Sequence, residues 1–280
     1  MIDLAPHNPY GLTLRQPVLT AAGCFGYSVE YARLADIAGI GAIITRSTTL
    51  HRRRVTQPPQ LIETPAGLLA VGAWPNPGLA RVIERHTPVW AGWDTPVLLS
   101  VAGTTIDEFA AFAAALEGVE GIAGLELNLA GHTETAARIV AATRAASQLP
   151  LLAKLPYLAG NRQALAELAR SVADAGADAV VAIGSPRGMA ADPQSGEQVE
   201  GWLSGPALRP LALALIADLT AAVSVPVIGC GGIASVEDAR QFLAAGAVAI
   251  QIGAALLSDP GAAARIGMQL AGKTAEPLND

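Results

Sequence analysis

The chain has few aromatic residues, two cysteines and no long apolar run. Aromatic residues make up 4% of its 280 positions, while hydrophobic residues of all types make up 51%. The core must therefore consist mainly of Ala, Val, Leu and Ile, which suits parallel strands that helices cover on both faces. The length is normal for a single α/β barrel.

The cysteines and the charge balance exclude several classes of protein. Cys24 and Cys230 lie far apart and lack the spacing of metal ligands, so we predict neither a disulfide framework nor a metal site. The absence of a membrane-length apolar run and of a basic leader predicts a cytoplasmic protein without membrane attachment. A net charge of −6 argues against a nucleic-acid partner bound through overall charge.

Eight short apolar segments alternate with helix-length segments, a pattern that predicts a single-domain (β/α)₈ TIM barrel of the α/β class. The expected strands are residues 18–22, 42–45, 97–101, 125–129, 151–155, 179–183, 227–229 and 249–252. Capping patterns predict a helix that begins near 104–108 and helices over 163–175 and 236–245, the last two each followed by glycine. Further helices are expected from about 77, 134 and 209.

Two segments interrupt this alternation, at about 51–76 and 184–206. Both contain proline and glycine, and we expect irregular loops. Each follows the carboxyl end of a strand, where barrel enzymes keep their catalytic residues. Long loops in compact domains are more often functional than not, so both are candidate parts of a site.

The last two expected strands each run into small residues, Gly231-Gly232 and Gly253-Ala254. Loops at these places form the usual phosphate-binding cup of a barrel. Glycine lets backbone N–H groups approach a phosphate closely, and a following helix favours its negative charge. The sequence therefore predicts a phosphorylated cofactor or substrate.

Six short motifs follow one another in the order found in dihydroorotate dehydrogenases. They are ETPAGLL at 63–69, NPG at 76–78, ELNL at 126–129, KLP at 154–156, LSGPA at 203–207 and GGI at 231–233. Over roughly residues 14–267 the chain resembles that family, in particular the soluble class and the catalytic subunit of its two-subunit, NAD-linked bacterial type.

The resemblance implies FMN as cofactor and hydride transfer to it from dihydroorotate or a related small acid. By motif, the residues implied to hold FMN are Ala21, Ala22, Gly23, Ser100, Asn128, Lys154, Gly205, Gly231, Gly232, Gly253 and Ala254. Lys154 is also implied to be catalytic, because a cation beside the flavin N1/O2 edge stabilises the reduced ring. The family further implies a homodimer and, in its two-subunit members, an electron-transfer subunit.

The substrate side departs from the family pattern. Where the family has a cysteine base, this chain has Gly131, which has no proton to exchange. The adjacent His132 is our predicted catalytic replacement, since histidine ionises near neutral pH, although a solvated loop histidine is the alternative. Arg46, Asn128 and Ser185 are the predicted contacts of a carboxylate-bearing substrate, with Arg46 in the place of a family lysine.

Three hypotheses remain open at this point. Besides an FMN oxidoreductase with an altered substrate, the pattern permits a non-redox phosphate-binding barrel enzyme and a non-catalytic flavin-binding homologue. Ala70 and Gly184 replace substrate asparagines of the family and favour an altered substrate. Cys24 is either reactive or an inert buried thiol, and Lys154 either faces the flavin or pairs with a carboxylate. The basic run at 51–54 is expected to be a solvated loop or an anion contact.

Overall fold

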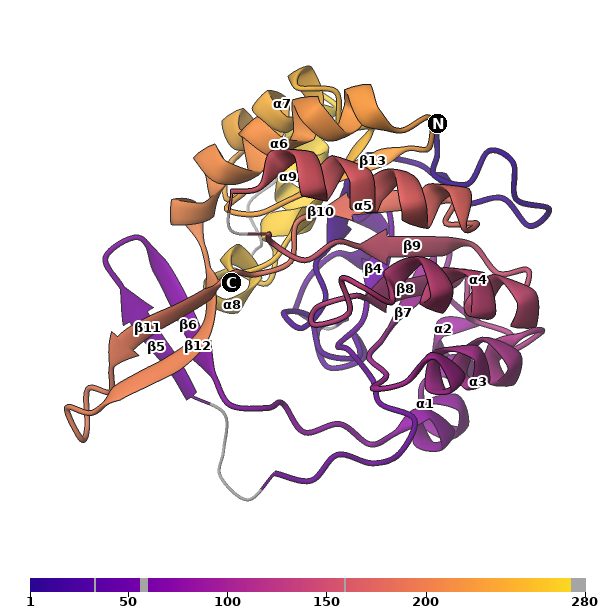
Figure 1. Ribbon diagram of the computed structural model, residues 1–280, viewed down its shortest axis with the longest axis horizontal. Coiled ribbons are helices and arrows are strands. Elements are labelled where there is room, and N and C mark those ends of the chain that lie inside the picture. The colour runs from indigo at the N-terminus through magenta and orange to yellow at the C-terminus, as the bar shows by residue number, and fades with distance from the viewer. Residues whose placement is uncertain (33, 56–59, 159, 273–280) are drawn as a thin grey trace.

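The computed structural model describes residues 1–32, 34–55, 60–158 and 160–272. Eight parallel strands form its central sheet, in the order β3-β14-β13-β10-β9-β8-β7-β4, and a bridge between Leu19 and Ala42 joins the first strand to the last. Their bounds are β3 (Val18–Thr20), β4 (Ile43–Ile44), β7 (Val97–Val101), β8 (Gly124–Asn128), β9 (Leu151–Lys154), β10 (Ala179–Ala182), β13 (Val227–Cys230) and β14 (Ala249–Ile252). The predicted (β/α)₈ barrel is confirmed, with helices around the strands (Figure 1).

The helices agree closely with their sequence signals. They are α1 (Leu79–Arg85), α2 (Thr87–Trp90), α3 (Ile106–Leu116), α4 (Ala136–Ala146), α5 (Arg162–Asp174), α6 (Arg209–Ala222), α7 (Val236–Ala244), α8 (Ala255–Ser258) and α9 (Ala262–Leu270), with 3₁₀ turns η1 (Ile37–Gly39) and η2 (Pro206–Leu208). Helix α4 begins two residues later than expected because the chain first makes a turn, in which Thr135 N donates to His132 O at 3.0 Å. No helix in the described part of the chain has the length and apolar content needed to cross a membrane.

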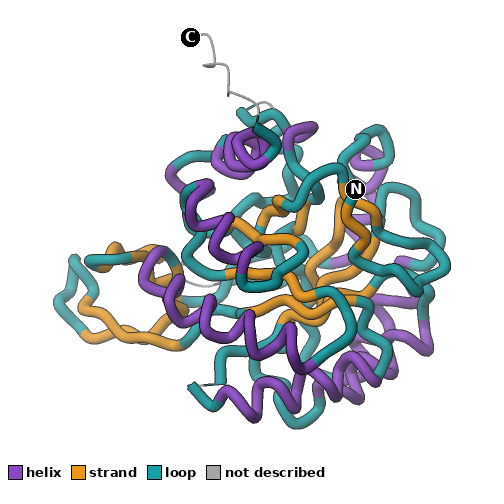
Figure 2. The backbone as a smooth tube through the Cα atoms, turned by 90° about the horizontal axis from the view of Figure 1, so that it is seen from above, coloured by secondary structure: helices purple, strands orange, loops and turns teal. Residues whose placement is uncertain are grey.

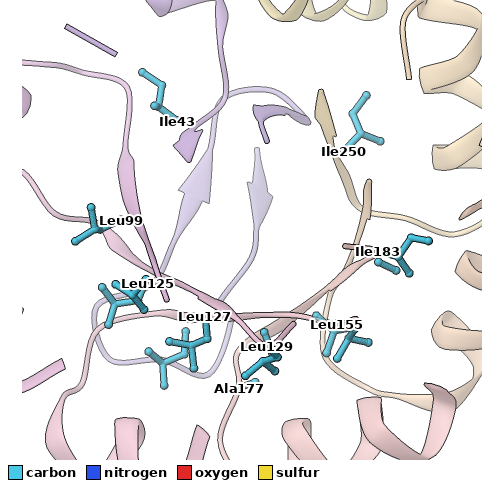
Figure 3. Packing of buried hydrophobic residues seen from close by; sticks show 14 of the residues in the cluster. Ile43, Leu99, Leu125, Leu127, Leu129, Leu155, Ala177, Ile183 and Ile250 are labelled. Atoms are coloured by element: carbon cyan, nitrogen blue, oxygen red, sulfur yellow. The ribbon is translucent and has the colours of Figure 1, made fainter. Parts of the chain in front are cut away.

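Residues of each barrel strand alternate between two buried faces. Leu99, Leu125 and Ile250 belong to the core between barrel and helices, outside the ring of strands (Figure 3). Their neighbours, such as Leu98, belong to a second core inside the barrel. The N-terminal hairpin of β1 (Ile2–Asp3) and β2 (Thr13–Leu14) contributes Leu14 to that inner core, which leaves the opposite, carboxyl end of the strands for a site.

The two interrupting segments form strands, so the expectation of irregular loops is wrong. β5 (Gln60–Thr64) and β6 (Gly67–Val71) come from the first segment, and β11 (Arg187–Ala191) and β12 (Gln198–Ser204) from the second. They make one antiparallel sheet in the order β11-β12-β6-β5, which projects from the side of the barrel (Figure 2). The pairing joins residues far apart in sequence, such as Leu203 with Leu69, which local composition does not reveal.

Candidate functional site

The carboxyl ends of four barrel strands bring polar side chains together in the barrel mouth. Asn128 ends β8 and pairs in register with Lys154, which ends β9. Gln251 on β14 pairs with Cys230 at the end of β13. Because alternate residues of a strand point to the same side, Glu126 faces the interior together with Asn128.

Lys154 is held by two residues that sequence reasoning missed. Its Nζ donates to Gln251 Oε1 at 2.8 Å, and Gln251 Nε2 donates to Glu126 Oε2 at 2.5 Å. Glu126 Oε1 lies 3.7 Å from Lys154 Nζ and has no hydrogen-bond partner among the described residues. The side chains of Lys154, Gln251 and Glu126 are all buried. The sequence did carry a signal for both residues, because Glu126 and Gln251 are polar side chains at inward positions of otherwise apolar strands.

The electrostatic environment keeps Lys154 cationic. Desolvation by itself lowers the pKa of the Lys154 ammonium group, but the charges around it, among them the Glu126 carboxylate, raise that pKa above its ordinary value. Glu126 is therefore the carboxylate that was expected as the alternative partner of Lys154. The positive charge of Lys154 nevertheless lies at the barrel mouth. A fixed cation in a low-dielectric mouth is suited to stabilising negative charge on a bound group.

Four backbone N–H groups at the rim of the barrel mouth find no acceptor among the residues that the structure describes. Those of Gly231, Gly232, Gly253 and Ala254 donate no hydrogen bond within the described part of the chain. They lie directly after β13 and β14, where the sequence predicted a phosphate cup. Amide donors without acceptors at this place are the chemistry that binds a phosphate.

The cup is packed so closely that only glycine fits at its centre. Gly232 has a φ of +74°, and a Cβ there would lie 2.7 Å from Arg209 N and 2.9 Å from Gly205 O. A Cβ on Gly205 would in turn lie 2.6 Å from Gly67 Cα in β6. The antiparallel sheet therefore abuts the cup through Gly205, one of the residues predicted to hold the cofactor.

The loop after β3 lies beside the other half of the cup. Ala21 N donates to Ile252 O at 2.7 Å, and a Cβ on Gly253 would lie 3.3 Å from Ala21 Cβ and 3.6 Å from Cys24 Sγ. The predicted segment of Ala21, Ala22 and Gly23 is thus adjacent to Gly253. Burial raises the pKa of the Cys24 thiol to about 11, so the thiol is protonated at neutral pH and fits the inert interpretation.

A serine that the sequence analysis overlooked connects two predicted cofactor contacts. Ser47 Oγ lies 2.8 Å from Ser100 Oγ, and Asn128 Nδ2 donates to Ser47 Oγ at 3.5 Å. Asn128 Oδ1 is occupied by Ala130 N at 3.1 Å. Ser47 carried no signal except its place directly after Arg46.

Arg46 lies near the mouth with unused hydrogen-bonding capacity. Its guanidinium carbon is 5.3 Å from the centre of the Trp74 ring, and its buried Nε has no partner among the described residues. Its charge also acts on Cys24, whose pKa it lowers against the larger effect of burial. A half-buried guanidinium with an unsatisfied donor suits a carboxylate ligand.

His132 and Ser185 differ in how they are placed. The His132 ring lies edge-on to Phe109 at 5.6 Å, with Nε2 3.1 Å from Gly103 O. A carbonyl oxygen only accepts, so Nε2 carries the proton and Nδ1 is left as the acceptor. Ser185 is exposed on the segment that leads from β10 into β11, and no hydrogen bond joins it to Arg46 among the described residues.

Comparison with known proteins decides the family. Residues 6–273 match the family model described as dihydroorotate dehydrogenase. The chain belongs to the dihydroorotate dehydrogenase family. Dihydroorotate dehydrogenase B (NAD(+)), catalytic subunit, of Desulforudis audaxviator is 40% identical over 93% of this chain and 89% of its own length. The proteins of the same name from Porphyromonas gingivalis (38%, covering 91% and 88%) and Geobacter sp. (37%, covering 93% and 90%) are also similar.

The family resemblance predicted from six motifs is therefore confirmed over nearly the whole chain. The relatives are named as catalytic subunits, which implies a further subunit in those dihydroorotate dehydrogenases. Of the motif residues, Lys154 ends β9, and Gly231 and Gly232 directly follow the end of β13.

Proposed function

We propose that the protein is an FMN-dependent oxidoreductase of dihydroorotate dehydrogenase type that oxidises dihydroorotate or a related small carboxylate. The observation that carries this proposal is a buried lysine, Lys154, fixed in the mouth of a barrel whose glycine rim has unengaged amides. Bound FMN supplies the ring that accepts a hydride.

The residues present fit FMN on three counts. The amides of Gly231, Gly232, Gly253 and Ala254 supply donors for the phosphate, and the loop that carries them is packed so that a Cβ at Gly232 would collide with Arg209 N and Gly205 O. Lys154 supplies the positive charge that an electron-rich ring requires. The remaining predicted contacts, Ala21, Ala22, Gly23, Ser100, Asn128 and Gly205, would line the ring and its side chain.

The substrate contacts favour a small carboxylate. Arg46 would bind the carboxylate through its guanidinium fork, with Trp74 holding the plane of that fork in place. Ser185 and Asn128 would complete the contacts. Ala70 on β6 and Gly184 have no side-chain amide, so a substrate that needs two side-chain amides would be bound weakly. This supports a related small acid over dihydroorotate itself.

His132 would take the proton that leaves the substrate. The bond of Nε2 to Gly103 O fixes the tautomer, and Nδ1 is the nitrogen free to accept. Gly131 beside it has a φ of +82° and open space where a side chain would stand. The base would therefore reach the substrate from the same loop that carries the family cysteine.

Gly131 also supports a second candidate, a flavin-binding homologue that has lost turnover. Without an acidic or basic group at this position, and with His132 engaged by Gly103, the barrel would bind FMN and not react. On either proposal the chain would form a homodimer, and the oxidoreductase would pass electrons to a separate subunit, as the subunit names of its relatives suggest.

The test is spectroscopic. Purified protein reconstituted with FMN should be yellow, and anaerobic addition of dihydroorotate or another small carboxylate should bleach the flavin. His132→Ala should slow bleaching by about 100-fold while leaving FMN affinity unchanged, because general base catalysis contributes about 10²–10⁴-fold. Thr133→Ala, at an exposed neighbouring position, is the matched control.

Each contrary result has a distinct meaning. Unchanged bleaching in His132→Ala removes His132 as the base. Bound FMN that no carboxylate bleaches supports the second candidate. A colourless protein that refuses FMN refutes both and leaves the non-redox barrel enzyme.

A further inference from the structure

A basic groove lies beside helix α1, and its lining residues are different from those of the barrel mouth described above. It has a volume of about 810 Å³ and is formed by the segment after β4, the residues before α1 and α1 itself. The charged residues that line it are Arg52, Arg53, Arg54, Arg81 and Arg85, and no aspartate or glutamate is among its described lining residues. Five of the 18 lysine and arginine residues thus gather in one groove of a chain whose net charge is −6.

These arginines are not neutralised within the protein. None of the five forms an ion pair in the described part of the chain, whereas Arg144, Arg209 and Arg265 all do. Arg81 and Arg85 stand four residues apart on α1, a spacing at which like charges repel each other and destabilise a helix. A bound polyanion would relieve this repulsion.

The backbone that carries the arginines is fixed on the start of α1. Arg53 N donates to Asn76 O at 3.1 Å, and Asn76 N donates to Arg53 O at 3.3 Å. Gly78 lies so close that a Cβ there would be 2.6 Å from Arg52 N. Leu79 N donates to Thr49 O at 3.1 Å. Both walls of the groove are therefore held in place by backbone contacts. A ligand would lose less of its binding free energy to ordering the groove, because the groove is already formed.

One residue that lines the groove, Asn76, is almost completely buried and fixed by hydrogen bonds. Asn76 is 5% exposed, and its Oδ1 accepts from Thr49 N, Thr49 Oγ1 and Gly78 N at 3.2, 3.0 and 3.1 Å. These three bonds fix the amide, and its buried Nδ2 has no partner among the described residues. The Asn76 side chain therefore holds the segment that carries the arginines against the start of α1.

A second unsatisfied nitrogen lies on the groove wall. His86 lines the groove, and its ring lies between Tyr27 at 4.7 Å and Trp90 at 5.7 Å. Its Nδ1 is buried without a hydrogen-bond partner in the described structure. The five arginines are therefore the groups that the groove offers to a ligand, and its wall behind them is fixed.

We propose that this groove binds a small anion that bears two or more phosphate groups. Planar guanidinium groups bind phosphate oxygens in a bidentate fashion, which favours phosphate for a groove whose cations are all arginine. The volume lies within the range of about 300–1,000 Å³ that small-molecule sites occupy. The site shares no residue with the proposed FMN cup or substrate contacts, so it stands or falls separately from the proposed function.

The probe is inorganic tripolyphosphate, titrated calorimetrically into the full chain at 50 and at 200 mM salt, with FMN present to occupy the cup. We expect saturable binding with one site per chain. Arg81→Gln/Arg85→Gln should weaken it at least tenfold, because both residues are exposed and removable without disturbing the fold.

The matched control is Arg138→Gln/Arg240→Gln, which removes the same charge from exposed positions on α4 and α7 and should change affinity less than twofold. Melting temperatures establish that every variant is folded. The proposal is overturned if wild-type protein shows no saturable binding, if both double variants lose affinity equally, or if citrate binds as tightly as tripolyphosphate. Binding of polyglutamate without tripolyphosphate would also overturn it, since the groove would then be a docking surface for acidic polypeptide.

Discussion

Gln251 fixes the ammonium group of Lys154 inside the barrel, with Oε1 2.8 Å from Nζ. The other end of the same amide donates to Glu126, so one glutamine orients both members of a buried charge pair. A lysine on a flexible stem is thereby held in one position at the mouth. Such preorganisation is what allows a charge to act on a bound ring without further rearrangement.

Breaking this pair should destabilise the fold. Lys154→Met leaves the fully buried Glu126 carboxylate without its cation, and we expect a loss of about 3–5 kcal/mol in the free energy of unfolding. Lys154→Met/Glu126→Gln removes both charges and should recover most of that loss. Urea denaturation of the apoprotein measures both. If Lys154→Met alone were as stable as the native chain, Glu126 would not be left as an unpaired charge in that variant.

Glycine at position 232 should be indispensable for the cup. Gly232→Ala places a Cβ against Arg209 N and Gly205 O, so FMN affinity should fall at least 100-fold and the melting temperature should also drop. Gly196→Ala is the matched control, because its φ is also +74° but a Cβ there meets nothing within 4 Å. Fluorescence titration with FMN makes the comparison. Equal effects from both would assign the loss to backbone strain alone.

Cys24 should make stability depend on pH in the alkaline range. The pKa of the Cys24 thiol in the folded protein is about 11, above the ordinary 9.0. The stability that depends on a protonated thiol is therefore fully present below about pH 9 and is lost as pH rises through 11. As pH rises through this range, the free energy of unfolding should fall by up to about 2 kcal/mol more in the native chain than in Cys24→Ala. Urea midpoints at pH 8 and pH 10.5 for both proteins provide the measurement. Parallel pH profiles would refute the assignment to Cys24.

An ion pair at the amino-terminal end of the barrel should matter for stability and not for the site. Arg144 donates to Asp178 Oδ2 at 2.5 Å and to the carbonyls of Gly176, Ser147 and Leu149. Arg144→Ala should cost about 3–5 kcal/mol, since it leaves the carboxylate largely buried and unpaired.

The control for Arg144 is an exposed pair. The Arg162 side chain is 58% exposed where it meets Asp218, so Arg162→Ala should destabilise the fold far less than Arg144→Ala. Denaturation midpoints separate the two variants, and FMN affinity should be unchanged in both. A similar cost for both would mean that burial does not set the value of these pairs.

Local sequence signals predicted the elements that local chemistry determines. The alternation of apolar residues predicted the eight strands, and the Thr105 cap, whose Oγ1 accepts from Glu108 N at 3.2 Å, predicted the start of α3. The glycine rim followed from the position of Gly232 after a buried strand. These features depend on residues within a few positions of one another.

Features that depend on distant pairing were missed. The contact of Lys154 with Gln251 spans 97 residues, and it follows from strand register around a closed barrel. The same is true of the antiparallel sheet, in which Trp202 pairs with Ala70. Composition described both segments as irregular because prolines and glycines lie near their strands, while the partner that makes each strand stable lies in the other segment.

Strand β12 pairs with β11 on one side and with β6 on the other. Each of the two inserted hairpins, β5–β6 and β11–β12, therefore depends on the other to complete the sheet. Excising only residues 184–206 would leave β6 with a naked edge, open to pairing with another molecule. It would also delete Gly205, which lies against Gly67. Any minimal version of this barrel must therefore lose both hairpins together or keep them both.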